Sequence, residues 1–287
     1  MSYALVPARQ RQRVFDELKL ALSLTTAEDL KAWGATSARL LPAIGKRRIR
    51  NFGALLCGLT RFTGRELGGV VKAWRRGNTL KHLGKRAEAG LNETIDFGKR
   101  AWVTVETIAR AVSDNPRENA PGVLALALGF VAGSGGIDGN GGIPDTDIAL
   151  FGIGDHRSLL THSIIAGVVA EGAILALADL AGIVCDKLPA GQRSSFWDTL
   201  SNTKEQIAGQ LAIGTSAGIA YHLAVDATLQ PAAYKDLPIS MPMEGHQTLF
   251  AMNAVVEGGD AISRKYKAEN RIRKNSNQKV VRHEHNE

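Results

Sequence analysis

The chain has 287 residues, of which 44% are hydrophobic, so it can bury a core and does not have the composition of a disordered segment. Its two cysteines, Cys57 and Cys185, lie far apart and outside any Cys-x-x-Cys motif, which argues against a disulfide framework or thiolate zinc site and favours a reducing compartment. The net charge of +7 is unevenly spread: Lys and Arg outnumber Asp and Glu by 22 to 11 in residues 1–118 and by 8 to 3 in 261–287, but residues 119–260 hold 5 against 14.

This charge pattern predicts three regions with separate roles. Residues 1–118 are expected to form a basic helical region, residues 119–262 an apolar and acidic helical domain that holds a metal site, and residues 263–287 a basic, disordered tail. The turn-forming stretch at 113–122 marks the first boundary. Basic ends favour contact with an anionic surface, either a membrane or a nucleic acid, and an acidic middle favours cation binding.

The sequence of the basic region predicts amphipathic helices. Thr25 and Glu28 form a predicted capping box, and apolar residues follow at helical spacing between Leu80 and Trp102. Two basic runs, 45–56 and 74–86, would fit phospholipid headgroups or nucleic-acid phosphates. The alternative is that they only form a solvated basic face.

The middle region predicts a four-helix bundle, so the fold class expected is all-α. Apolar helices are expected at 122–133, 163–185 and 207–226, and a fourth begins at His246. Small residues in the third helix, among them Gly214 and Gly218, suit close helix packing. The glycine-rich stretch at 133–142 lacks the lysine of a phosphate-binding loop, so we expect a flexible connector there.

The bundle topology predicts a metal site. His222 and Asp226 are four residues apart, so a helix places them on one face, although such a pair can simply hydrogen-bond internally. An antiparallel hairpin of 163–185 and 207–226 would bring the start of the first helix to the end of the second. The candidate ligands gathered at that end are Asp145, Asp147, His156, His162, His222, Asp226 and His246.

Imidazole and carboxylate donors together favour zinc or manganese, and the predicted pole has enough donors for one or two divalent ions. Metal ions lower the pKa of bound water, which makes hydroxide available for hydrolysis near neutral pH. The predicted catalytic set contains all of these candidates except His246. Arg157 is added to it, either to bind an anionic substrate or to hold a carboxylate in place. No Ser-His-Asp arrangement is persuasive.

Three elements of this region resemble a known family. They are "PDTD" at 144–147, "HRSLLTHS" at 156–163 and "HLAVD" at 222–226. Their order is similar to that of the LexA-binding, inner-membrane-associated, metal-dependent hydrolases of bacteria, over about residues 120–260. More distantly, the site is similar to the helical zinc sites of phospholipase C and P1 nuclease. The resemblance implies a metal-dependent hydrolase that acts on a phosphodiester, phospholipid or other ester. The site residues that it implies are Asp145, Asp147, His156, His162, His222 and Asp226.

Membrane insertion is expected as well, because the stretches 163–185 and 207–225 are long enough to cross a bilayer. The excess of positive residues at the pole away from the predicted metal site is the distribution that inner-membrane proteins show on the cytoplasmic side. A soluble helical bundle is the alternative. Two other function classes stay open: a membrane-associated interaction or pore-forming protein whose polar cluster is structural, and a nucleic-acid-binding protein that uses the basic ends.

Overall fold

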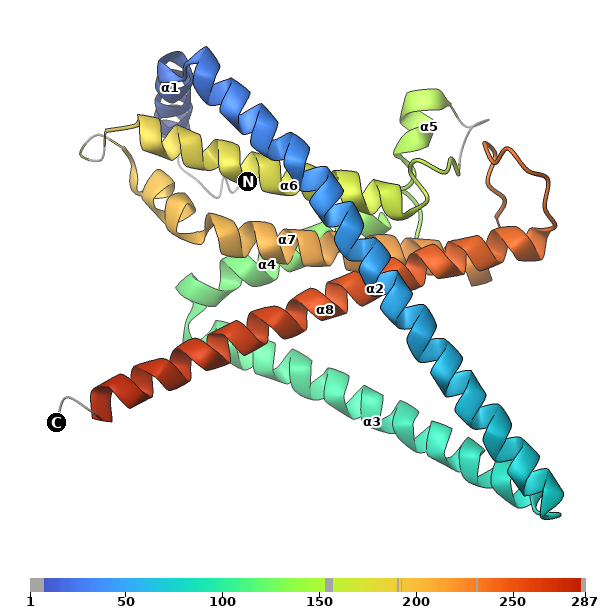
Figure 1. Cartoon of the computed structure of the whole chain (residues 1–287). Helices are drawn as coiled ribbons and strands as arrows, with labels where there is room; N and C mark the ends of the chain where they lie inside the picture. Colours follow the sequence, from blue (N-terminus) through green and yellow to red (C-terminus); the bar gives the residue numbers. More distant parts are fainter. Residues whose placement is uncertain (1–7, 153–156, 190, 192, 231, 285–287) are drawn as a thin grey trace, which may run out of the picture. The chain divides into compact units, whose positions relative to one another are not determined.

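The computed structural model describes residues 8–152, 157–189, 191, 193–230 and 232–284. The described chain is all-helical, as the sequence predicted (Figure 1). The helices are α1 (Ala8–Leu24), α2 (Ala27–Arg75), α3 (Thr79–Asp114), α4 (Pro116–Ser134), α5 (Thr146–Phe151), α6 (Ile164–Lys187), α7 (Ser195–Thr228) and α8 (Met243–Glu284).

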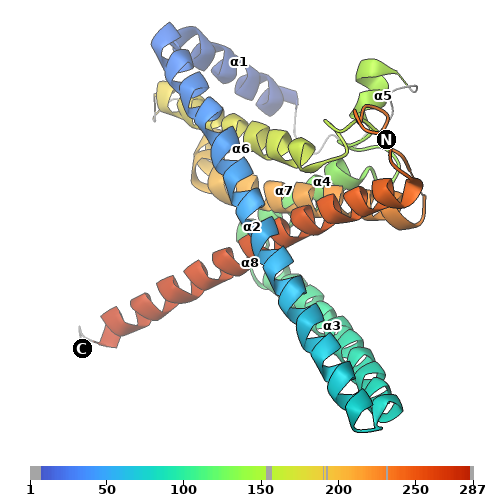
Figure 2. The same cartoon turned by 45° about the vertical axis from the view of Figure 1, so that its right-hand side comes forward.

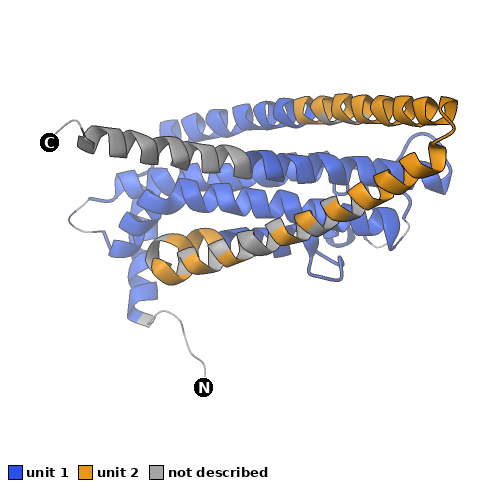
Figure 3. Cartoon of the chain, turned by 90° about the horizontal axis from the view of Figure 1, so that it is seen from below, with its two compact units in different colours: residues 1–49, 124–287 blue, residues 50–123 orange. Residues whose placement is uncertain are grey.

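The chain divides into two compact units (Figure 3). Unit 1 contains residues 1–49 and 124–287, and unit 2 contains residues 50–123. Two helices cross this division, since α2 begins in unit 1 and α4 ends there. The sequence placed all of residues 1–118 in one basic region, whereas the structure groups α1 and the first half of α2 with the bundle.

Unit 1 is built on the predicted bundle. Helices α6 and α7 pack against each other as an antiparallel hairpin, and α8 runs back along α7 (Figures 1 and 2). Ile219, Leu223, Phe250 and Ala254 form the core between α7 and α8. The start of α6, the end of α7 and the start of α8 therefore lie at one end of the bundle.

The end of α4 joins the bundle through glycines that face each other across the contact with α7. A Cβ atom built on Gly214 would lie 2.0 Å from the Leu126 carbonyl oxygen, and one on Gly218 would lie 2.2 Å from that of Phe130. The α4 glycines, Gly129 and Gly133, face the α7 backbone just as closely. Each helix thus carries a Gly-x-x-x-Gly pair, which allows the two backbones to touch.

Helix α2 begins one residue later than the sequence suggested. The Asp29 amide donates to Thr26 Oγ1 at 3.2 Å and the Thr26 amide donates to Asp29 Oδ2 at 2.8 Å. The capping box therefore uses Thr26 and Asp29 rather than Thr25 and Glu28, because an aspartate at the third helical position satisfies the amide of the cap as well as a glutamate does.

Within unit 1 the first half of α2 lies along α6. The Trp33 indole donates to the Ala176 carbonyl at 2.8 Å, and Leu41 fills the space that the absent side chain of Gly172 leaves. At one end of this contact Lys187 pairs with Asp29 at 2.6 Å. Contacts spread over this length hold α2 firmly to the bundle.

The same contact buries a group of charged residues, which we call the arginine–carboxylate cluster. Arg48 has no exposed surface, and its guanidinium binds Glu257 at 2.6 Å and Glu171 at 3.3 Å. Arg47 binds Glu171 at 2.6 Å and Asp260 at 2.9 Å. The cluster consists of three arginines and three acidic residues: Arg47, Arg48, Arg264, Glu171, Glu257 and Asp260. The basic run at 45–56 thus supplies buried ion pairs and not only a surface.

Unit 2 contains the second half of α2, all of α3 and the first part of α4, and its α2 and α3 segments form a helical hairpin (Figure 1). The turn between them passes through Gly77, whose φ of 70° lies in the left-handed region that glycine tolerates best. Glu66 and Arg86 pair across the hairpin, and Gly69 lets His82 pack against the α2 backbone.

The backbone of α8 continues to Glu284, whereas the composition of residues 263–287 predicted disorder. The helical backbone therefore includes most of the predicted tail.

Among the described residues, α6 is the helix long and apolar enough to cross a membrane. The second predicted span, 207–225, does not meet that criterion. It forms the latter part of α7, where glycines and the buried polar residues Ser216 and His222 lower the apolar content.

Candidate metal centre

Backbone turns on both sides of α5 position the first candidate residues. Gly141 has a φ of 89°, and its amide donates to the Asp145 carboxylate, so the glycine-rich stretch folds back over the residue that it precedes. Ser163 caps α6 by accepting a hydrogen bond from the Ile165 amide at 3.1 Å, which fixes His162 immediately before the helix. The sequence predicted only a flexible connector at 133–142, but this loop determines where Asp145 lies.

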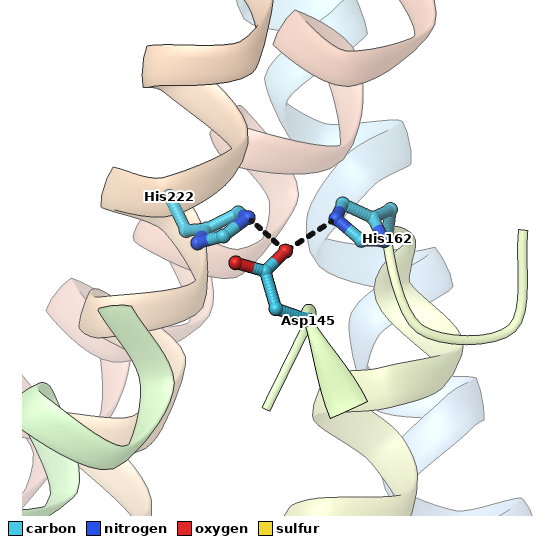
Figure 4. A group of neighbouring side chains, drawn as sticks. All are labelled: Asp145, His162 and His222. Atoms are coloured by element: carbon cyan, nitrogen blue, oxygen red, sulfur yellow. Dashed lines mark ion pairs between the residues drawn. The ribbon is translucent and has the colours of Figure 1, made fainter. Parts of the chain in front are cut away.

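Four side chains converge from these segments and from the end of α7. Asp145 Oδ1 lies 3.3 Å from His162 Nε2 and 3.4 Å from His222 Nε2 (Figure 4). Asp226 Oδ2 lies 3.7 Å from the same atom of His162 and 3.5 Å from that of His222. A tetrahedral ion with bonds of about 2.0–2.1 Å holds its ligand atoms roughly 3.3–3.4 Å apart. The separations of Asp145 from the two imidazoles match this spacing, and Asp145, His162 and His222 have possible ligand atoms that all lie within 4.8 Å of one another. Asp226 lies beside both imidazoles but is outside this group of three.

The other nitrogen of each imidazole faces a protein acceptor. His162 Nδ1 lies 3.3 Å from Asp147 Oδ2 and 3.0 Å from Thr161 Oγ1. His222 Nδ1 lies 3.4 Å from the Ser134 carbonyl at the end of α4. Acceptors at Nδ1 orient an imidazole and favour the tautomer whose Nε2 is free to bind a metal. Both histidines thus present Nε2 to the same point.

Asp147 lies behind His162, although the sequence grouped it with the direct ligands. Its Oδ2 atom also accepts hydrogen bonds from the Arg157 amide at 2.8 Å, the Ser158 amide at 3.0 Å and Thr161 Oγ1 at 2.8 Å. This carboxylate is completely buried and holds the chain between Arg157 and His162 in position.

Arg157 holds the second carboxylate. Its Nε and Nη2 atoms donate to Asp226 Oδ1 at 3.2 and 3.1 Å, which turns Oδ2 of that carboxylate toward the two histidines. The Arg157 backbone has a φ of 73°, a strained conformation for a residue with a side chain. Of the two roles predicted for Arg157, the structure shows the contact that holds a carboxylate.

The close spacing of charges shifts two pKa values strongly. Burial alone would lower the pKa of His222, but hydrogen bonds with Asp145 and Asp226 outweigh burial and raise it to about 9. Burial would raise the pKa of Asp145, yet its hydrogen bonds with His162, His222 and Gly141 hold it well below the ordinary range. A cation at this position, whether a proton or a metal ion, is therefore stabilised.

The candidate centre is almost closed to solvent. His162 and Asp147 have no exposed surface, and the side chain of Asp226 is 4% exposed. The side chains of Asp145 and Arg157 are 12% and 25% exposed, so solvent reaches the cluster from their side. A ligand from solution would approach past these two residues.

The structure places the remaining candidates differently. His246 Nδ1 accepts a hydrogen bond from the Tyr234 amide at 3.2 Å, and His246 is not one of the three residues, Asp145, His162 and His222, whose possible ligand atoms all lie within 4.8 Å of one another. His156 lies outside the described residues.

Residues that the sequence did not suggest support the centre from α8 and from the loop between α7 and α8. Tyr234 donates its hydroxyl to the His162 carbonyl at 2.6 Å and stacks on Phe250 at a ring separation of 4.2 Å. Asp236 accepts from the Leu159 amide at 2.8 Å, and Asn253 accepts from the Ile164 amide at 3.1 Å. No spacing or motif marks these residues, because each acts on backbone that is distant in sequence.

The fold and site define an all-helical bundle with a buried histidine–aspartate cluster able to hold a metal ion. Comparison of the chain with protein-family models, curated protein sequences and solved structures found no match. The family resemblance drawn from the three sequence elements accordingly stays a prediction.

Proposed function

We propose that this chain is a metal-dependent hydrolase that binds one divalent ion, zinc or manganese, through Asp145, His162, His222 and Asp226. The observation that carries the proposal is that Asp145 Oδ1 and Asp226 Oδ2 each lie 3.3–3.7 Å from the Nε2 atoms of both His162 and His222. Two nitrogens and two oxygens are a common donor set for these metals. One ion is proposed rather than two, because Asp147 already accepts hydrogen bonds from three groups.

The metal, when bound, would supply a water of lowered pKa and would polarise the bond that is cleaved. Residues of the chain would orient the ligands and bind the substrate. Asp147 keeps His162 in the binding tautomer, and Arg157 keeps Asp226 in its orientation. Substrate would enter on the side of Asp145 and Arg157, whose side chains are partly exposed, and the Arg157 guanidinium there favours an anionic group such as a phosphodiester or phospholipid headgroup.

Metal analysis tests the binding part of this proposal. We expect purified protein to hold about one zinc or manganese ion, and the double variant His162→Ala, His222→Ala to hold none. His82→Ala, which removes a histidine from unit 2, should keep the metal. If wild-type protein supplied with zinc and manganese binds neither, the proposal is wrong.

Activity assays test the reaction. Metal-loaded protein should hydrolyse at least one of three probes: a nitrophenyl phosphodiester, a phosphatidylcholine or a nitrophenyl ester. The double variant should lose that activity while His82→Ala retains it. Metal binding without hydrolysis of any probe would instead favour the alternative of an interaction protein with a structural metal.

We further propose that unit 1 associates with a membrane. Several of its charged groups are buried, in the arginine–carboxylate cluster and the metal centre, while apolar side chains are exposed on three helices. Leu124 and Leu128 of α4 are 61% and 65% exposed, Leu177 of α6 is 63% exposed, and Ile262 of α8 is 72% exposed. Ionisable residues inside and apolar residues outside are the distribution that a bilayer favours.

Carbonate washing of cell membranes tests this second proposal. An inserted protein stays in the membrane fraction at high pH, whereas one bound only to the surface is released. Recovery of the whole protein in the soluble fraction before any wash would contradict membrane association.

The hairpin of unit 2 supports a third proposal, that it binds an anionic membrane surface. Exposed arginines and lysines alternate there with exposed apolar residues, among them Trp74 at 72%, Leu67 at 61% and Phe62 at 53%. Basic residues interleaved with large apolar ones are typical of membrane-surface helices, and apolar side chains add little to nucleic-acid binding.

Replacing Phe62 and Trp74 with serine should weaken binding to vesicles that contain phosphatidylglycerol. If it leaves vesicle binding intact and DNA binds more tightly than lipid, the nucleic-acid alternative is favoured.

A further inference from the structure

An apolar groove lies in unit 1 at the end of α6 opposite the metal centre. Its larger part, about 380 Å³, is lined by α1, α6 and α7, including Phe15, Leu180 and Trp197. A second part of about 180 Å³ adjoins the first and has Leu177, Ala181 and Leu200 in its lining as well. Binding pockets for small ligands are commonly 300–1,000 Å³ and mostly apolar.

The groove runs along α6. It follows α6 from Ile174 to Val184, which at 1.5 Å per residue is about 15 Å. Ile164, where α6 begins beside the metal centre, lies roughly 24 Å along the same helix from Leu180. The groove is therefore a separate feature and not the substrate entrance of the proposed hydrolase.

One cation lines this groove. Lys204 belongs to the smaller part, and its ammonium group lies against Gly182 of α6, 2.4 Å from where a Cβ atom would be. Nearby cations have partners, since Lys187 pairs with Asp29, Arg193 with Asp198 and Arg13 with Glu17. Lys204 forms no ion pair with any residue that the structure describes. A half-buried, unpaired ammonium group in an apolar groove attracts an anion.

We propose that this groove binds a long-chain fatty acid, with the hydrocarbon chain along α6 and the carboxylate at Lys204. The shape suits a single flexible chain, the lining suits hydrocarbon, and the ammonium group suits a carboxylate. The proposal does not depend on the metal centre or on hydrolysis.

Calorimetric titration of the full-length protein with dodecanoate and with dodecanol, each below its micelle concentration, tests the proposal. Wild-type protein should bind dodecanoate saturably with a stoichiometry of one. Lys204→Met should weaken dodecanoate binding by about tenfold and leave dodecanol binding unchanged, since only the charged partner is lost. Lys19→Met, which removes an exposed lysine outside the groove, is the matched control and should bind both probes as wild type does.

A second pair of variants tests the location. Ala181→Phe fills the groove and should abolish binding of both probes, whereas Ala173→Phe, on an exposed position of the same helix, should not. Circular dichroism and metal content identify any variant that fails to fold. The proposal is overturned if dodecanoate shows no saturable binding, if Ala181→Phe still binds it, or if a two-chain phospholipid binds equally well.

Discussion

At the scale of single residues, the geometry of the candidate centre depends on the groups that hydrogen-bond to each candidate ligand and orient it. His162 and His222 both present Nε2 because Asp147, Thr161 and the Ser134 carbonyl lie at their Nδ1 atoms. Asp226 presents one oxygen because Arg157 holds the other. Removing such a supporting group leaves the ligands in place but loosens their geometry.

Asp147→Asn tests this support. The amide keeps the size of the side chain but loses an acceptor, so we expect the affinity for zinc to fall by about 10- to 100-fold without loss of the fold. Competition with a chelator of known affinity measures the change. Asp138→Asn, an identical substitution at an exposed loop position, should have no effect, and equal affinities for both variants would contradict the assigned role.

The raised pKa of His222 predicts a pH dependence of metal binding. Because this pKa is about 9 without metal, a proton must leave before the ion binds, and zinc affinity should rise about tenfold per pH unit between pH 7 and pH 9. Affinity that does not change over this range would contradict the raised pKa.

The same shift predicts the stability of metal-free protein. A histidine with a raised pKa stabilises the fold fully below its unfolded value, near 6.5, and this contribution disappears as the pH rises through 9. The midpoint of thermal unfolding of metal-free protein should therefore fall between pH 7 and pH 9.5. In His222→Gln that decrease should be smaller, and an equal decrease in both proteins would contradict the prediction.

At the scale of helices, the crossing of α4 and α7 depends on glycine. Any side chain at Gly218 would meet the Phe130 carbonyl and the Ser134 amide, and Ser134 also contacts His222. The glycine pairs thus determine both helix packing and the position of one metal ligand.

Gly218→Ala tests the crossing. Since backbone atoms cannot move aside easily, we expect a loss of about 1–3 kcal/mol in the free energy of unfolding, and weaker zinc binding. Gly209→Ala is a control in the same helix, where nothing lies within 4 Å of the new Cβ atom. That control should instead stabilise α7 by roughly 0.5–1 kcal/mol. Similar changes in thermal unfolding for the two variants would contradict close α4–α7 packing.

For the whole molecule, the arginine–carboxylate cluster ties α2 to α6 and α8. Its buried groups stabilise one another, and burial raises the pKa of Glu257 to about 8 although Arg48 opposes this shift. Gly167 is required beside the cluster, because a Cβ atom there would lie 2.2 Å from Arg48 Nη1. Arg48 also donates to the Ile164 carbonyl at 3.3 Å, two residues after His162.

Arg48→Met should destabilise the protein by about 3–5 kcal/mol, because it leaves buried carboxylates without their partner. Thermal unfolding followed by circular dichroism measures the loss. Arg50→Met, at an exposed position two residues away, should change stability by less than about 0.5 kcal/mol. Equal effects would mean that the cluster does not hold the fold together.

Much of the fold could be predicted because helical periodicity is local. The helices at 163–185 and 207–226 follow from apolar runs of helical length, and the antiparallel hairpin was predicted across the polar connection at 186–206, although α7 in fact begins earlier, at Ser195. Hairpin geometry then brings His162 to His222 and Asp226, which the sequence predicted and the structure shows. Boundaries were harder, since Thr26 and not Thr25 caps α2.

The sequence by itself determined the helical class, the charge distribution and the end of the bundle at which histidines and aspartates meet, because these depend on composition and on neighbours along one helix. Only the tertiary structure decided that Asp147 stands behind His162, that Tyr234 supports the same histidine, and that Arg48 is buried with Glu257. These relations join residues up to 209 positions apart. No local pattern encodes them, because they arise only when separate helices pack.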